Sequence, residues 1–312
     1  MKKWGILSLV IILIHSIQHK GYAQEITLIK KTHFSHFPSA SSIEYYNNRL
    51  YVFGDDAPKM LVLDNEHNLV DSMQLFPTRK DVMKKGDKAD LESSFLFTEE
   101  GKTTLVAMGS FSSKERREIV EITFGDKVRL KDVKRGDVDL IDKKIKEPNI
   151  EGATLIGNKL VLANRANKTH RTNYLLVSNF DGKDLLKRKQ QHIISVNLPI
   201  TKNVRGVSGL SYIKNNDLLL FTLTTEKTDD SIKDGEIGES YLGIIYNVST
   251  KIKDNAIKPD RLLPLSQILE TKEYQKIEAV TVESGSAKEL LLHLTADNDN
   301  GKSNLFKIKV TL

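Results

Sequence analysis

Five stretches of the chain repeat one plan, and this repeat constrains the fold more than any other feature of the sequence. Each opens with an apolar residue followed by an acid or a serine, passes through a turn, and continues in a second apolar run. The opening runs are Ala40-Ser41-Ser42-Ile43, Leu91-Glu92-Ser93-Ser94, Ile150-Glu151-Gly152-Ala153, Val207-Ser208-Gly209-Leu210 and Ile277-Glu278-Ala279-Val280. The second runs are residues 49–53, 104–108, 159–163, 217–221 and 289–293. Short apolar runs separated by Gly, Asn, Asp or Lys turns predict an all-β chain.

A third strand follows in every repeat and a fourth in most of them, which predicts a single β-propeller over residues 24–312. The last repeat ends at Leu312 after three strands, while residues 25–33 form a strand without a repeat of its own. We therefore expect the N-terminal strand to complete the last blade and close the ring, which protects sheet edges. Five blades are predicted. Six blades are the alternative if residues 246–277 contain another, and a two-sheet sandwich is the structural alternative.

The N-terminus has the pattern of a cleaved secretory signal. Lys2 and Lys3 precede an apolar run over residues 4–14, and Gly21-Tyr22-Ala23 supplies small residues for a peptidase. The run is shorter than the ~20 apolar residues that cross a bilayer. We predict a signal peptide over residues 1–23 and export to the periplasm or the extracellular space, without membrane attachment after cleavage. An uncleaved anchor is the alternative.

Composition limits the partners of the mature chain. The net charge is +6, but lysines are spread among acids, and no nucleic-acid-binding motif is present, so we expect no nucleic-acid partner. Cysteine is absent, so the core must be held by burial without disulfides. We expect a monomer that binds a small-molecule, glycan or other anionic ligand.

Polar residues of all five repeats fall at equivalent positions, which propeller geometry would gather at one end of the central channel. The residues that open the first strands are Ser41, Glu92, Glu151, Ser208 and Glu278. Those that close the second strands include Asp55, Asp56, Asn164, Arg165, Glu226 and Asp297, and Arg205 precedes a first strand. Three glutamates around a narrow channel should repel one another unless a cation lies among them.

Three interpretations of this polar ring remain open. Oxygen ligands could hold Ca²⁺, which accepts six to eight of them, and the candidate metal ligands are Glu92, Glu151, Glu278, Asp55 and Asp297. Alternatively, an anionic ligand could bind by forked hydrogen bonds from arginine, and the candidate ligand-binding residues are Arg165, Arg205, Asn164 and Ser208. In the third interpretation, each glutamate caps or pairs with the backbone of its own blade, as a repeated structural device.

The repeated openings also resemble the secreted propellers known as phytase-like or "esterase-like activity of phytase" proteins. Ile150-Glu151-Gly152-Ala153, Asn158 to Leu162 and Asn164-Arg165 carry most of the resemblance, with echoes at residues 90–92 and 277–280. The resemblance implies a propeller with a site at the channel mouth, in some members calcium-dependent and in some hydrolysing phosphate esters. Serine at two of the five ring positions departs from that family. A binding module and a calcium-dependent hydrolase of phosphate esters or lactones both remain open.

Overall fold

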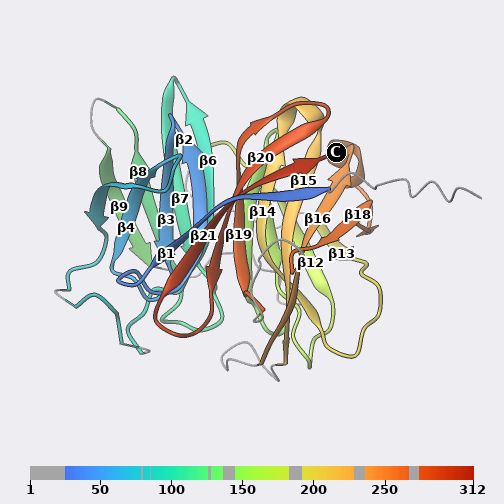
Figure 1. Ribbon diagram of the computed structural model, residues 1–312, viewed down its shortest axis with the longest axis horizontal. Coiled ribbons are helices and arrows are strands. Elements are labelled where there is room, and N and C mark those ends of the chain that lie inside the picture. Colours follow the sequence, from blue (N-terminus) through green and yellow to red (C-terminus); the bar gives the residue numbers. More distant parts are fainter. Residues whose placement is uncertain are drawn as a thin grey trace, which may run out of the picture.

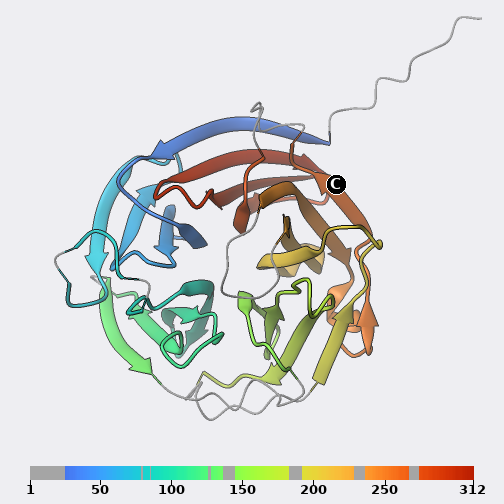
Figure 2. The ribbon, with the colours of Figure 1, turned by 90° about the horizontal axis from the view of Figure 1, so that it is seen from below.

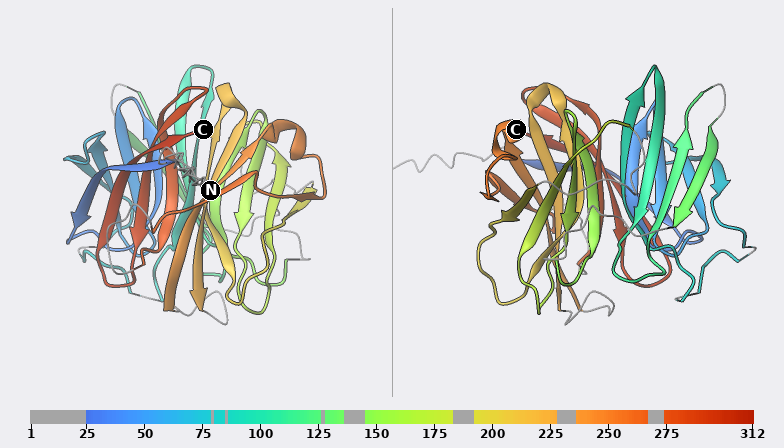
Figure 3. Two further views of the ribbon diagram at one scale, coloured as in Figure 1. Left: turned by 45° about the vertical axis from the view of Figure 1, so that its right-hand side comes forward. Right: turned by 180° about the vertical axis from the view of Figure 1, so that it is seen from behind.

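The computed structural model describes residues 25–78, 80–84, 86–125, 128–135, 145–182, 192–227, 236–266 and 274–312. Five β-sheets are arranged around a central axis, as Figure 2 shows in a view along that axis. Figures 1 and 3 show the same sheets from the side, with their inner strands running along the axis. The chain is a five-bladed β-propeller, as the repeats predict. The predicted signal peptide, residues 1–23, lies outside the described residues.

Each blade is an antiparallel sheet whose first strand is innermost. The first two blades comprise β2 (Ala40–Tyr46), β3 (Arg49–Gly54), β4 (Lys59–Asp64) and β5 (Leu69–Gln74), then β6 (Leu91–Glu99), β7 (Lys102–Gly109), β8 (Glu118–Thr123) and β9 (Arg129–Arg135). The third comprises β10 (Ile150–Ile156), β11 (Lys159–Asn164), β12 (Asn173–Asn179) and β13 (His192–Val196). The last two comprise β14 (Arg205–Ile213), β15 (Leu218–Lys227), β16 (Glu236–Tyr246) and β18 (Arg261–Pro264), then β19 (Ile277–Gly285), β20 (Glu289–Asp297) and β21 (Ser303–Thr311).

The N-terminal strand closes the ring. Strand β1 (Ile26–Phe34) pairs antiparallel with β21, from Ile26 opposite Val310 to Phe34 opposite Ser303. It thereby supplies the fourth strand of the fifth blade, which confirms the predicted closure. In Figure 2 it is the blue strand outside the red ones.

The segment between β16 and β19 does not form a sixth blade in its described part. It contributes a short helix α1 (Val248–Lys251), the two-residue strand β17 (Ala256–Ile257) and β18. Strand β17 pairs in parallel with β13, so it extends the third blade instead of starting a new one. No helix among the described residues is long and apolar enough to cross a membrane.

The core lies between neighbouring blades. One apolar cluster, for example, joins Leu220 of the fourth blade to Leu292 and Phe306 of the fifth. Since the inner strands meet closely at the axis, they tolerate only small side chains there. A Cβ atom added to Gly209 would lie 2.8 Å from the Cα of Ala279, and one added to Gly152 would lie 2.9 Å from the nitrogen of Leu210.

Candidate functional site

A β-bulge in every blade presents the ring residues at one face of the propeller. The register of the first two strands shifts at the same place in all five blades, and the residue passed over is Ser41, Glu92, Glu151, Ser208 or Glu278. A bulge re-aims a side chain and bends its strand. The five positions aligned from sequence are therefore equivalent in space. We call the face where these inner strands begin the mouth.

Arg165 lies among three glutamates from three different blades. Its guanidinium nitrogens are 3.1 Å from Glu151, 2.8 Å from Glu226 and 3.5 Å from Glu278. The arginine side chain is 7% exposed, and it lies against Gly206, where an added Cβ would come within 2.5 Å of its Nε atom. Burial opposes its charge, but the glutamates raise the pKa of Arg165 further above its usual value. Arg165 therefore ties three blades together.

Lys276 neutralises the same side of the mouth. Its ammonium group is 3.2 Å from both Glu278 and Asp299. Burial alone would lower the pKa of Lys276, but Glu278 and Glu226 hold it well above the usual value. Burial raises the pKa of Glu278 to about 8, against the opposite influence of Lys276 and Arg165. The negative charge of Glu278 is therefore limited in two ways, by its tendency to bind a proton and by its ion pairs with Lys276 and Arg165.

The other side of the mouth holds a carboxylate triad, Asp55, Asp90 and Glu92, contributed by the first two blades. One oxygen from each carboxylate lies within 4.8 Å of the others, a spacing at which three ligands can share a metal ion. Burial, and then the nearby charge of Glu151, raises the pKa of Glu92 well above its usual value. Like charges crowded in this way favour a bound cation or a bound proton.

Two cations contact this triad within the described chain. The ammonium group of Lys88 pairs with Asp55 and lies 2.9 Å from Asp90, and the side chain is 16% exposed. Arg116 pairs with Asp90 at 3.1 Å. The carboxylates of Asp55 and Asp90 therefore share two cations, whereas Glu92 makes no direct ion pair with any described residue.

Two further carboxyl groups border the triad. Burial raises the pKa of Asp56 to about 7, with the neighbouring charge of Asp55 adding to the effect. Burial likewise raises the pKa of Asp297 to about 6. One buried oxygen each of Asp55 and Asp56 accepts no hydrogen bond from the described part of the chain. Such oxygens are costly to leave without a donor or a cation.

The structure separates the residues predicted to bind a ligand. The Arg205 guanidinium donates to the Tyr241 hydroxyl at 3.1 Å and lies 4.4 Å from the centre of that ring. Asn164 accepts a hydrogen bond from the Asn149 backbone at 2.8 Å, and Ser208 donates to the Ile277 carbonyl oxygen at 2.6 Å. Among the predicted metal ligands, Asp55 and Glu92 meet in the triad, whereas Glu151 and Glu278 meet at Arg165.

Sequence reasoning missed several charged residues at this site, among them Lys88, Asp90 and Lys276. Asp90 and Lys276 directly precede a first strand, and Lys88 lies just upstream of Asp90, whereas Arg205, expected before a first strand, is the first residue of β14. Because the strand that follows begins at the mouth, residues just before it must lie there too. Extending the alignment upstream of each first strand would have found them.

The chain belongs to a protein family. The "Family of unknown function (DUF6929)" matches residues 36–310, which is nearly the whole propeller. No curated protein matches the sequence at a significant level. The comparisons show no phytase-like family, so only the short motifs of the repeated openings support that resemblance.

One of three similar solved structures supports the fold. Glutaminyl cyclase from Myxococcus xanthus is similar with a TM-score of 0.53 at 10% identity, over 92% of this chain and 97% of that one. An α-L-arabinanase from Cellvibrio cellulosa, solved with arabinohexaose, has a TM-score of 0.46 at 12% identity, over 88% and 91% of the two chains. A protein of unknown function from Dyadobacter fermentans has a TM-score of 0.47 at 8% identity, over 93% and 100%. At such identities the first similarity shows the fold alone, and the other two carry no argument.

Proposed function

We propose that this propeller is an exported binding module whose mouth takes up a divalent cation, with Ca²⁺ as the first candidate. The observation that carries the proposal is the carboxylate triad, whose oxygens lie within 4.8 Å of one another. Ca²⁺ prefers oxygen ligands and accepts flexible sets of six to eight, so water or a ligand would complete its shell. Export rests on the N-terminal signal pattern.

The triad, rather than the whole ring of glutamates, is the proposed site. Glu151 and Glu278 are already paired with Arg165, a cation that does not exchange. Glu92 has no such partner among the described residues, and a buried oxygen of Asp55 accepts no hydrogen bond there. Three carboxylates supply enough negative charge to offset a divalent ion.

Lys88 would then act as an internal competitor for the site. Its ammonium group occupies the space between Asp55 and Asp90, so a metal ion must displace it. Lysine can move in this way because its charge sits on a flexible four-carbon stem. Removing the ammonium group should therefore strengthen metal binding, whereas removing a carboxylate should weaken it.

The test is calorimetric titration of chelator-treated protein, residues 24–312, with Ca²⁺, followed by thermal unfolding. At 100 times its dissociation constant, an ion that binds only the folded state stabilises it by about 2.7 kcal/mol. We expect Glu92→Gln to abolish the response and Lys88→Met to enhance it. Glu44→Gln is the matched control, since Glu44 is a half-buried inner-strand acid outside the triad. Absence of binding to both the wild type and Lys88→Met would refute the proposal.

A second candidate function is metal-dependent hydrolysis of phosphate esters or lactones. The observation that favours it is Asp56 beside the triad, because one of its buried carboxyl oxygens accepts no hydrogen bond from the described residues and is thus available to exchange a proton with a substrate. A bound metal ion would polarise the bond to be cleaved. A screen of phosphate esters and lactones with wild type and Asp56→Asn separates the two functions. Turnover that requires both Asp56 and the metal would establish the enzyme, and calcium binding without turnover would leave a binding module.

A further inference from the structure

The propeller has a second concave site at the end of the axis opposite the mouth. Strand β6 runs from Leu91 at the mouth to Glu99 at this far end, and β10 ends there at Ile156. A cleft of about 490 Å³ opens between these blades, and we call it the far cleft. Its lining includes Leu96, Phe97, Thr98, Glu99, Leu155 and Phe180.

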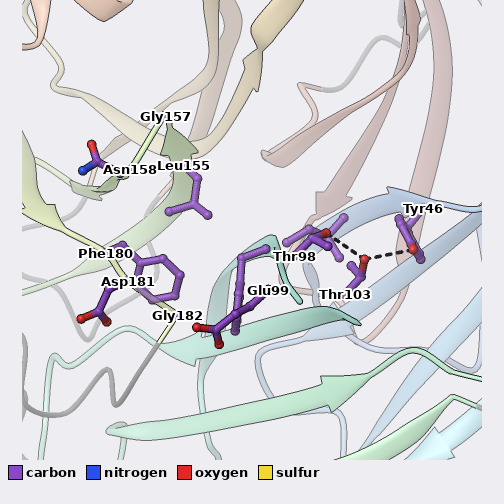
Figure 4. Close-up of a pocket in the computed structure, with 12 residues that line it drawn as sticks. Tyr46, Thr98, Glu99, Thr103, Leu155, Gly157, Asn158, Phe180, Asp181 and Gly182 are labelled. Carbon is purple, nitrogen blue, oxygen red and sulfur yellow. Dashed lines mark hydrogen bonds between the residues drawn. The ribbon is translucent and has the colours of Figure 1, made fainter. Parts of the chain in front are cut away.

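Apolar side chains form much of the interior of the far cleft. Phe97 and Leu155 are only partly buried and pack against the core between the second and third blades, and Leu96 packs in the same way against the core between the first and second blades. Phe180 meets Phe97 edge to face with ring centres 5.0 Å apart, which fixes both rings. Figure 4 shows Leu155 and Phe180 facing the cleft from one side, with Thr98 and Glu99 on the other. A concave apolar site of this kind suits the body of a small organic molecule.

Polar groups are placed along one wall. The Tyr46 hydroxyl donates to Thr103 at 3.0 Å, and the Thr103 and Thr98 hydroxyls lie 2.9 Å apart (Figure 4). If Thr103 donates to Thr98, the exposed Thr98 hydroxyl keeps a proton to give to a ligand. The three linked hydroxyl groups can thus orient a polar group of a ligand without adding charge to the cleft.

The charge of the far cleft selects the class of ligand. Among the described residues that line it, the charged side chains are Glu99 and Asp181, and both are negative. The Glu99 carboxylate lies against Gly182, where an added Cβ would come within 2.8 Å of its oxygen. Glu99 also lines an adjoining hollow together with Lys102, Arg129 and Lys131. Glu99 therefore places a carboxylate at the edge of the far cleft, between its apolar side chains and this basic hollow.

We propose that the far cleft binds a small organic amine, with its apolar body against Leu96, Phe97 and Leu155 and its ammonium group on Glu99. A charge-assisted hydrogen bond to a carboxylate is about twice as strong as a neutral one. Aromatic edges and aliphatic side chains accommodate the uncharged part. This site is independent of the mouth, because none of its lining residues belongs to the triad.

Three matched probes test the proposal: 2-phenylethylamine, neutral 2-phenylethanol and anionic phenylacetate, each titrated calorimetrically against residues 24–312. We expect the amine to bind more tightly than the other two. Glu99→Gln should weaken amine binding about tenfold or more, as expected for loss of a hydrogen bond between charged groups. Thr98→Arg, at an exposed position, should block it by placing a competing cation in the cleft.

The control variant is Glu289→Gln, an exposed glutamate of the fifth blade that should leave amine affinity unchanged. Thr98 and Glu99 are both exposed, so we expect their variants to fold. Thermal unfolding of each variant is the measurement that checks this. Equal affinity for the three probes would overturn the proposed charge selection. Tighter binding of phenylacetate would do the same and would place the ligand on the side of Arg129. Undiminished amine binding by Thr98→Arg would show that the amine binds elsewhere.

Discussion

At the scale of single residues, Arg165 determines how the mouth is held together. One guanidinium satisfies carboxylates from the third, fourth and fifth blades, and its planar fork of donors allows this where a lysine ammonium group would not. Because these ion pairs are buried, their net contribution to the free energy of folding is small, whereas breaking one of them is strongly destabilising. Losing one partner of a buried pair leaves the other charges without compensation.

Arg165→Ala should therefore lower the free energy of unfolding by about 3–5 kcal/mol at pH 7.5, the cost of stranding buried charge. The loss should shrink at pH 5, because the stranded glutamates can then take up protons. Arg165→Lys should recover only part of the stability. Urea unfolding at the two pH values measures each effect.

Arg205→Ala is the matched control for Arg165, since Arg205 contacts the Tyr241 ring and hydroxyl instead of buried carboxylates. We expect it to cost about 1 kcal/mol, typical of a cation–π contact that is partly exposed. Equal losses in the two variants would contradict the central role of Arg165.

The mouth could be predicted in part from the repeated sequence. The ring positions follow from aligning the five openings, since a repeated strand start must recur at one face. The residues with which each ring residue pairs could not be predicted in the same way. Glu278 and Arg165 lie 113 positions apart, and their contact depends on the rotation between blades. The sequence left Arg165 either paired with Glu151 or facing a ligand, and the structure shows it paired.

At the scale of strands, the repeated motif has a structural explanation. The ring residue forms the bulge, and the residue after it is always small: Ser42, Ser93, Gly152, Gly209 and Ala279. A larger side chain at Gly209 would collide with the backbone of the next blade. The acidic-small pattern is therefore partly a packing requirement, which explains why short motifs of this kind carry little functional specificity.

Most strands could be predicted because hydrophobic alternation and turns mark them locally. The pairing of β17 with β13 could not be predicted, because a two-residue strand has too few residues to show a pattern and its partner strand is distant in the sequence, with Ser195 opposite Ala256. The number of blades could not be decided from the sequence for the same reason, because it depends on the strand with which the segment after β16 pairs.

Strand β1 offers a direct test of ring closure. Only Ile26 of this strand is buried, so its contribution comes mainly from the hydrogen-bond ladder with β21 and from covering that edge. Removing residues 25–34 should lower the melting temperature of the 24–312 protein by about 10 °C, equivalent to several kcal/mol in a domain of this size.

A synthetic peptide of residues 25–34 should restore part of the lost stability in a concentration-dependent manner, because an exposed sheet edge can accept a strand from solution. A peptide of the same composition in scrambled order is the control. An unchanged melting temperature after the deletion would contradict closure by β1.

At the scale of the whole molecule, the seam between the first and last blades contains a buried chain of proton donors and acceptors. Thr32 of β1 is 3.0 Å from Nδ1 of His67, whose Nε2 is 2.9 Å from Nδ1 of His293. Nε2 of His293 is 2.8 Å from the Glu283 carboxylate. If His293 donates to Glu283, then His67 donates to His293 and Thr32 to His67. Each histidine is then neutral with one proton, and a further proton on Nδ1 of His293 would place two donors face to face.

This seam predicts loss of stability in acid. Burial lowers the pKa of His67 to about 3, and the charges of His293, Lys30 and Lys307 lower it further. Burial also lowers the pKa of His293 to about 4, although its contact with Glu283 acts in the opposite direction. The unfolded chain binds these protons below the ordinary pKa of 6.5, whereas the folded chain does not. The contribution of each histidine to the free energy of unfolding is therefore complete above pH 6.5 and falls as the pH decreases towards 4, by about 2 kcal/mol per histidine at pH 5.

The variant His67→Gln keeps a donor towards His293 but cannot titrate. Urea unfolding should therefore show that its free energy of unfolding falls less steeply in acid than that of the wild type. His33→Gln, at an exposed site of β1, is the control and should retain the wild-type slope. Burial raises the pKa of Glu44 to about 8, which favours folding as the pH falls, but this effect is common to all three proteins and cancels in the comparison. Identical slopes for His67→Gln and the wild type would show that protonation of this seam does not govern acid stability.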